Sequence, residues 1–266
     1  MSSPRVDATL RGGAYCLRCS PPPARVGGDF SGMKECPVSL RAVVVMDYQS
    51  VHLTAHDVFD PDGERHDALI HPVRFARTAI RRRNECQRAG YPEAVLREVI
   101  TFRGLPHTDY SWEQHRRCMA QADQWRRDGA TVELRDLRYS FRMTAEGSPA
   151  TDVYGRKIPE GTGREKGIDV LVALTCLRRA LEPEVDLVVL ASRDTDLVPV
   201  LDAVYDMRAA SSTVAKIETV SWFDRQAVTQ GRFAGGSLRP TRPRRIWNTN
   251  LDRSCFEAAR DTHDYQ

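Results

Sequence analysis

The stretch "DLVVLASRDTDLVPVLDAV" (residues 186–204) decides the fold. It begins with a continuous apolar run, LVVLA, which is typical of a strand buried on both faces of a parallel sheet. Asp194 and Asp196 follow this run directly, and the apolar residues then recur with the spacing of a helix. Two carboxylates between a buried strand and a helix lie at the carboxyl end of that strand, where open α/β folds bind their ligands.

The same alternation of strands and helices extends along most of the chain from residue 38. Each apolar run is followed by an amphipathic stretch that ends near glycine or proline, as helices do. We therefore expect a three-layer α/β fold with a mainly parallel central sheet and helices on both faces. The expected strands are 41–47, 94–104, 130–141, 186–192 and 216–224, and the expected helices are 71–90, 111–129 (capped by Ser111), 165–181 and 196–208.

The ends of the chain have a different composition. Residues 1–37 are rich in Gly, Pro, Ser and Arg and show no periodicity, which predicts a disordered leader and leaves Met33 as a possible true start. The main domain is expected over 38–225. Residues 226–266 are expected to form an extension with a terminal helix docked by Trp247, Leu251 and Phe256. Residues 142–164 form a polar, glycine-rich loop in this interpretation.

Composition excludes several classes of protein. With 41% hydrophobic residues the chain can fill a core, and its net charge of +3 is only mildly basic. No apolar stretch approaches the roughly 18 to 20 residues of a membrane span, and no signal peptide is evident, so we expect a cytoplasmic protein.

The seven cysteines of the chain are expected to be free thiols, with Cys118 and Cys176 in the core. Cys16 and Cys19 have metal-ligand spacing but lack a second pair.

Four aspartates are predicted to meet at one edge of the sheet. Asp47 ends the first strand, Asp194 and Asp196 follow the fourth, and Asp169 lies in the first turn of the helix that precedes the fourth strand. Clustered carboxylates repel one another unless a cation neutralises them, and Mg²⁺ or Mn²⁺ is the matching ion because hard cations prefer oxygen ligands. The alternative is that each aspartate only caps or ends its element, with Asp194 an N-cap candidate.

Three segments resemble the signatures of the NYN domain, a branch of the PIN-like ribonuclease superfamily, in the same order. They are "VVVMDYQSVH" (43–52), "REKGIDVLVAL" (164–174) and "VVLASRDTDLVPVL" (188–201), and the resemblance covers about residues 40–224. Two positions depart from the pattern: Ser50 stands where Asn is usual, and Thr175 stands where many members carry a further Asp. The family's acidic positions match Asp47, Asp169, Asp194 and Asp196, and its polar positions match Lys166 and Ser192.

The resemblance implies metal-dependent hydrolysis of single-stranded RNA. Asp47 and Asp194 would be the principal Mg²⁺ or Mn²⁺ ligands, with Asp169 and Asp196 completing the set. Substrate contacts would come from Ser50, Lys166 and Ser192. The arginine runs 81–83, 116–117 and 126–127 either track the RNA backbone or are solvated helix faces.

A second interpretation stays open: a non-catalytic NYN module that binds RNA or a protein partner. A homodimer is also possible. Phosphatases of the haloacid-dehalogenase type need a second Asp where this chain has Gln49, and Toprim domains expect a glutamate in place of Asp47. A nucleotide-binding Rossmann domain would need a glycine-rich turn that "DYQSVH" lacks.

Overall fold

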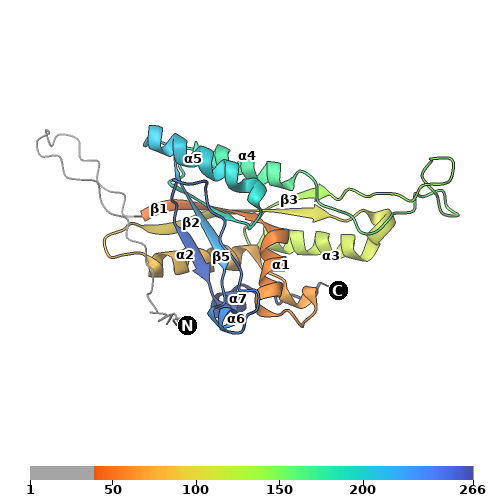
Figure 1. Cartoon of the computed structure of the whole chain (residues 1–266), viewed down its shortest axis with the longest axis horizontal. Helices are drawn as coiled ribbons and strands as arrows, with labels where there is room; N and C mark the ends of the chain where they lie inside the picture. Colours follow the sequence, from red (N-terminus) through yellow and green to blue (C-terminus); the bar gives the residue numbers. More distant parts are fainter. Residues whose placement is uncertain (1–38, 266) are drawn as a thin grey trace, which may run out of the picture. The chain divides into compact units, whose positions relative to one another are not determined.

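A six-stranded, all-parallel sheet forms the centre of the protein (Figure 1). The computed structural model describes residues 39–265, which lie within one compact unit, Pro37–Gln266. The α/β fold expected from the sequence is confirmed. The expected leader, with Met33, Cys16 and Cys19, lies outside the described residues.

The strand order in the sheet is β3-β2-β1-β4-β5-β6, and every neighbouring pair is parallel. Connections from β1 to β3 run outward on one side, and the chain then returns to the middle to add β4, β5 and β6 on the other. This order places β1 beside β4 at the centre of the sheet. The strands are β1 Ser39–Asp47, β2 Glu93–Leu105, β3 Thr131–Asp136, β4 Leu187–Ala191, β5 Lys216–Trp222 and β6 Asn248–Leu251.

Helices cover both faces of the sheet, as expected (Figure 1). One face packs against α1 (Tyr48–Phe59), α2 (Pro72–Cys86), α3 (Thr108–Arg127) and α7 (Arg253–Ala259). The other packs against α4 (Ile168–Ala180) and α5 (Val198–Ala210). Three short helical segments complete the described elements: η1 Arg65–Ala68, η2 Thr195–Leu197 and α6 Arg225–Thr229.

The two faces of β1 explain its continuous apolar run. Val44 and Met46 belong to the core beneath α1, α2, α3 and α7, whereas Val43 and Val45 belong to the core beneath α4 and α5. Alternate residues of a strand point to opposite faces, so a central strand covered on both sides has no solvent-facing position. All four of these side chains are at most 2% exposed.

Three elements differ from the expected ones. The helix α3 begins at Thr108 with His107 as its N-cap, and Ser111 has non-helical dihedral angles at a kink, so the expected cap at Ser111 is wrong. The helix α1, which directly follows β1, had not been predicted. The strand expected over 130–141 ends at Asp136, and the chain beyond it enters the antiparallel ribbon described below.

The C-terminal segment contributes a strand as well as a helix. Leu251 and Phe256 are buried, as expected for a docked segment, and Trp247 is half-buried. The strand β6 pairs with β5 through only four residues, "NTNL", whose polar composition conceals a strand from sequence analysis. The sheet therefore extends past the domain boundary expected at residue 225.

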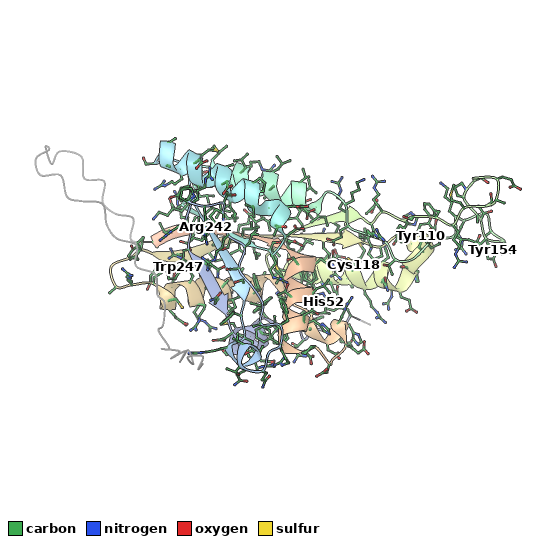
Figure 2. The ribbon with its side chains drawn as sticks, in the orientation of Figure 1. His52, Tyr110, Cys118, Tyr154, Arg242 and Trp247 are labelled. Carbon is green, nitrogen blue, oxygen red and sulfur yellow. The ribbon has the colours of Figure 1, made fainter. Side chains whose placement is uncertain are left out.

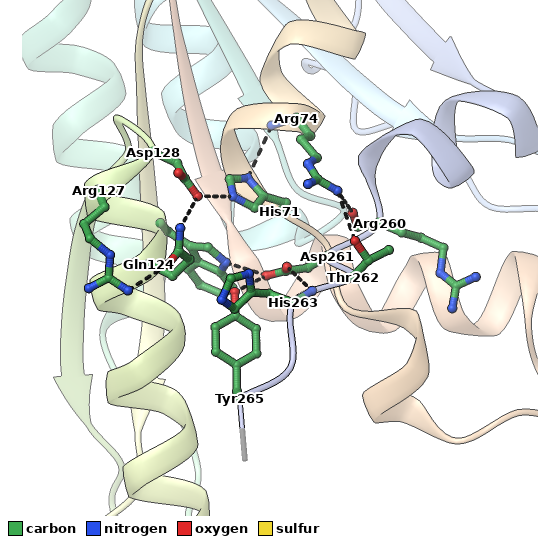
Figure 3. Close-up of polar contacts among 11 residues, drawn as sticks. His71, Arg74, Gln124, Arg127, Asp128, Arg260, Asp261, Thr262, His263 and Tyr265 are labelled. Carbon is green, nitrogen blue, oxygen red and sulfur yellow. Dashed lines mark hydrogen bonds and ion pairs between the residues drawn. The ribbon is translucent and has the colours of Figure 1, made fainter.

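The last residues are fixed to the helical face by buried polar contacts (Figure 3). Asp261 is 8% exposed, and its Oδ2 accepts hydrogen bonds from the indole N–H of Trp125 and the hydroxyl of Tyr265, both at 2.7 Å. A ring nitrogen of the nearby His71 lies 2.9 Å from Asp128 at the end of α3. We call the contacts of Asp261 with Trp125 and Tyr265 the C-terminal clasp.

Candidate functional site

The predicted site lies at the centre of the carboxyl edge of the sheet, where β1 and β4 end side by side. The helices that follow β1 cover one face of the sheet, whereas the helix that follows β4 covers the other face. The strand order therefore reverses between β1 and β4. Ligands of open α/β sheets bind in the crevice at such a switch point. Asp47 ends β1, and Asp194 follows β4 by three residues.

Asp47 is buried, and both of its carboxylate oxygens accept hydrogen bonds. Its side chain is the N-cap of α1 through the N–H of Ser50 at 3.2 Å, and Ser192 Oγ donates to Oδ2 at 2.8 Å. Burial raises the pKa of Asp47 to about 6, although the two hydrogen bonds oppose that shift, and the charges of Asp169 and Asp194 raise the pKa further. The carboxyl group is therefore held in one orientation and lies within electrostatic reach of the other acids.

Asp169, Asp194 and Asp196 form a compact group beside it. One carboxylate oxygen from each lies within 4.8 Å of those of the other two. Asp169 projects from the first turn of α4, whereas Asp194 is the N-cap of η2 and accepts the N–H of Asp196 at 2.9 Å. Burial raises the pKa of Asp169, and the negative charges of Asp194 and Asp196 raise it further. Thus the structure brings three of the four predicted acids together, with Asp47 buried alongside.

The two predicted serines support the acids. Ser192 is 3% exposed, donates to Asp47, and accepts the N–H of Asp194 at 3.0 Å. Ser50 Oγ accepts the N–H of Arg193 at 2.9 Å, which ties the start of α1 to the segment after β4. Both hydroxyls therefore fix the backbone and carboxylates of the site.

The segment before α4 explains the spacing of Lys166, Gly167 and Asp169. Gly167 is the N-cap of α4 with φ +77°, a conformation that favours glycine, and a Cβ there would lie 3.3 Å from the Arg135 guanidinium. Lys166 is exposed just before this turn. Thr175, at the position where the resemblance expects a further carboxylate, is buried within α4.

Glu165 is a residue of this site that the sequence analysis missed. It is half-buried, and its Oε1 accepts the N–H of Gly104 in β2 at 2.6 Å. Burial raises its pKa to about 7, and the negative charge of Asp47 adds to that shift. Gly104 leaves room for this contact, because a Cβ there would lie 2.8 Å from the Glu165 side chain. The signal in the sequence that could have identified Glu165 is its position directly before Lys166 in the motif "REKGIDVLVAL".

The capping alternative accounts for part of the arrangement. Asp47 and Asp194 are both N-caps, so each is explained singly by the helix that it begins. Capping does not explain why Asp169, from a different element, holds its carboxylate within 4.8 Å of Asp194 and Asp196, since like charges oppose that approach. Oxygen ligands from separate elements, partly open to water, fit the needs of Mg²⁺ or Mn²⁺, which keep several waters when bound.

Two of the three predicted arginine runs lie away from this edge. The run 81–83 ends α2, which leads into the start of β2, so it lies at the amino edge of the sheet. Arg83 is itself buried and paired with Glu218 at 3.0 Å. Arg126 and Arg127 end α3 just before β3 begins, and they contact Asp123 and Gln124 on their own helix. These two runs therefore lie away from the acids, whereas Arg116 and Arg117 are exposed in the first half of α3, which follows the carboxyl end of β2.

Comparisons with known proteins give no further guide to this site. No protein-family model, no curated protein and no solved structure matches the chain. Within residues 39–265, no helix is long and apolar enough to cross a membrane.

Proposed function

We propose that this protein is a metal-dependent ribonuclease that hydrolyses phosphodiester bonds in single-stranded RNA, with Mg²⁺ or Mn²⁺ as its cofactor. The observation that carries the proposal is the group of Asp169, Asp194 and Asp196, with oxygens within 4.8 Å, beside the buried Asp47 at the switch point of the sheet. The motif resemblance to NYN domains supplies the substrate class. Such an enzyme would act in the cytoplasm.

Each residue has a distinct task in this proposal. Asp169, Asp194 and Asp196 would hold the ion, and Asp47 would complete the set from the end of β1. A divalent ion in such a site lowers the pKa of a bound water and stabilises charge on the scissile phosphate. Ser192 fixes the Asp47 carboxylate, and Ser50 holds the backbone at Arg193. Lys166, exposed just before α4, would contact a phosphate as a point charge.

The decisive experiment compares cleavage with binding. Purified protein is incubated with Mn²⁺ or Mg²⁺ and a panel of labelled unstructured RNAs, and Asp47→Asn and Asp194→Asn are assayed beside the wild type. We expect both variants to lose turnover and to keep RNA affinity, or to gain slightly, since a negative charge near the phosphates is removed. Asp123→Asn is the control, because this exposed acid pairs with Arg126 on α3.

The non-catalytic alternative has its own support in two residues. Thr175 is buried and adds no carboxylate, and the hydroxyl of Ser50 is engaged by the backbone of Arg193. If the wild type binds the RNA panel with salt-sensitive affinity and leaves every RNA uncut, the binding module is the better account. If it binds no RNA, a protein partner takes the place of the substrate.

A further inference from the structure

An antiparallel ribbon between β3 and α4, residues 138–164, extends from the carboxyl edge of the sheet (Figure 1). We call it the arm. The sequence predicts a polar loop over most of this range, yet the chain pairs with itself at Arg138 with Arg164, Phe141 with Pro159, and Thr151 with Lys157. The arm leaves the sheet after β3 and returns five residues before Asp169, so it begins and ends beside the candidate site.

The tip of the arm is a braced turn that displays an aromatic side chain. Asp152 Oδ1 accepts the N–H groups of Tyr154 and Arg156, both at 2.9 Å, and Gly155 takes the left-handed conformation with φ +77°. Val153 is 93% exposed and Tyr154 is 79% exposed. Figure 2 shows Tyr154 at the end of the arm, far from the core. An aromatic ring on such a turn contributes to no core, and the turn that carries it has its backbone already ordered for binding.

The base of the arm is anchored to α3. The ring of Tyr110 lies 4.7 Å from the ring of Tyr139 and 5.7 Å from that of Phe141. The Tyr139 hydroxyl also accepts the N–H of His107 at 3.1 Å. Contacts of this kind hold the direction of the arm relative to the sheet, so its tip is not a free loop.

The arm carries five cationic side chains and three acidic ones, Glu146, Asp152 and Glu160, of which only Asp152 forms an ion pair within residues 39–265. Arg138, Arg142 and Arg164 are exposed, and within residues 39–265 none of them forms an ion pair. Lys157 lies 5.4 Å from the ring of Phe141. Arg156 pairs with Asp152 and also lies 5.2 Å from the ring of Tyr154. The arm thus supplies, at the edge of the candidate site, cations that the runs 81–83 and 126–127 do not.

We propose that the arm binds single-stranded RNA and guides it toward the carboxylates. Tyr154 stacks on a base at the tip, and Arg138, Arg142 and Arg164 contact phosphates along the ribbon. Exposed aromatic rings combined with unpaired cations are the elements of sequence-independent single-strand binding, since every base has a stacking face and every nucleotide a phosphate. This proposal rests on the proposed function for its ligand, but it does not require catalysis.

Binding is tested by fluorescence anisotropy with a labelled, mixed-sequence single-stranded RNA, in an Asp194→Asn background to prevent cleavage. Tyr154→Ala is expected to weaken binding about 5- to 150-fold, the range of one lost base stack, and Tyr154→Phe to retain it. Tyr91→Ala is the matched control: Tyr91 is 50% exposed but precedes β2, at the opposite edge. Circular dichroism melting of each variant confirms that the fold is kept.

The charge component is tested by salt dependence. The triple variant Arg138→Ala, Arg142→Ala, Arg164→Ala should make the dependence of affinity on salt shallower, because fewer counterions are released. The exposed Arg77 and Arg88, changed together to Ala, should leave that slope unchanged.

The outcomes separate this proposal from the proposed function. Unchanged affinity in Tyr154→Ala and in the triple variant, with cleavage by the wild type intact, overturns the role of the arm and leaves the ribonuclease standing. Affinity lost in the arm variants, with no cleavage by the wild type, supports the arm and removes the ribonuclease. A wild type that binds no RNA overturns both.

Discussion

The hydroxyl of Ser192 donates a hydrogen bond to Asp47 Oδ2 at 2.8 Å, across 145 residues of sequence. The Oγ of Ser192 also accepts a hydrogen bond from the N–H of Asp194 at 3.0 Å. One buried side chain after β4 therefore connects the acid that ends β1 with an acid of the carboxylate group. The site is held together by this contact as well as by the parallel pairing of β1 and β4.

Ser192→Ala should destabilise the protein by about 1.5 to 3 kcal/mol, the usual contribution of a hydrogen bond to a charged group. The buried Asp47 would lose the shorter of its two hydrogen bonds, and its pKa would rise further above about 6. Urea unfolding at pH 7.5 measures the change. Ser140→Ala is the control, because this serine is exposed on the arm. Equal midpoints for the two variants would contradict the role assigned to Ser192.

The titration of Glu165 predicts a pH dependence of stability. Its pKa in the folded protein is raised from the ordinary value of 4.5 to about 7, so the folded state binds this proton more tightly than the unfolded state does. Its contribution to stability is therefore fully present below about pH 4.5 and is lost as the pH rises toward 7. The Glu165→Gln variant has no carboxyl group to ionise at this position and so keeps this stability at high pH. The stability of the variant relative to the wild type should therefore increase between pH 5 and pH 8.

The size of that relative increase should be roughly 1 to 3 kcal/mol, reduced from the full shift because Glu165 is only half-buried. Chemical denaturation at several pH values, with a chelator present, measures it. Glu160→Gln provides the comparison, since Glu160 is exposed on the arm. Parallel stability curves for Glu165→Gln and the wild type would show that Glu165 titrates normally.

The C-terminal clasp makes a prediction about stability far from the acids. Asp261→Ala would leave the indole N–H of Trp125 without its acceptor in a fully buried position, at a cost of about 1 to 3 kcal/mol. Tyr265→Phe removes only the hydroxyl that donates to Asp261. Because this hydroxyl is less buried than the Trp125 indole, the loss of stability should be smaller. Thermal unfolding followed by circular dichroism ranks the two variants. The reverse order would show that the clasp depends on Tyr265.

Apolar periodicity was sufficient to predict the layers of the fold and the edge at which the acids gather. The runs at β1 and β4 are continuous because both faces are buried, and parallel strands must end at the same edge. The strand β6 was not predicted because it is only four residues long, is mostly polar, and gains its stability from pairing with β5. Pairing of that kind depends on distant residues, which local patterns do not record.

The finer arrangement of the site depended on tertiary contacts. Glu165 was within a quoted motif, but its burial against Gly104 arises only when β2 and the segment before α4 come together. The arm was expected to be a loop because Gly147 and Gly155, which form its turns, also make the composition loop-like. The roles of Ser50 and Ser192 in holding the backbone and the buried acid could not be separated from substrate contacts by sequence alone.

A divalent ion should stabilise the protein through the carboxylate group. Saturating Mg²⁺ or Mn²⁺, at about 100 times the dissociation constant, adds about 2.7 kcal/mol, which corresponds to a rise of about 5 to 10 °C in Tm for a unit of this size. Asp194→Asn should abolish that rise, because it removes one of the three close oxygens. Without any ion, Asp169→Asn should itself raise the Tm, since repulsion from Asp194 and Asp196 is relieved.

Differential scanning fluorimetry with and without the ion measures both effects, and isothermal calorimetry gives the affinity. Glu113→Gln is the control for a general loss of negative charge, because Glu113 is exposed on α3 and lies outside the carboxylate group. If Asp194→Asn gains as many degrees as the wild type, the ion binds elsewhere. If neither ion shifts the wild type, the three aspartates are held together without a cation, and the proposed metal site is contradicted.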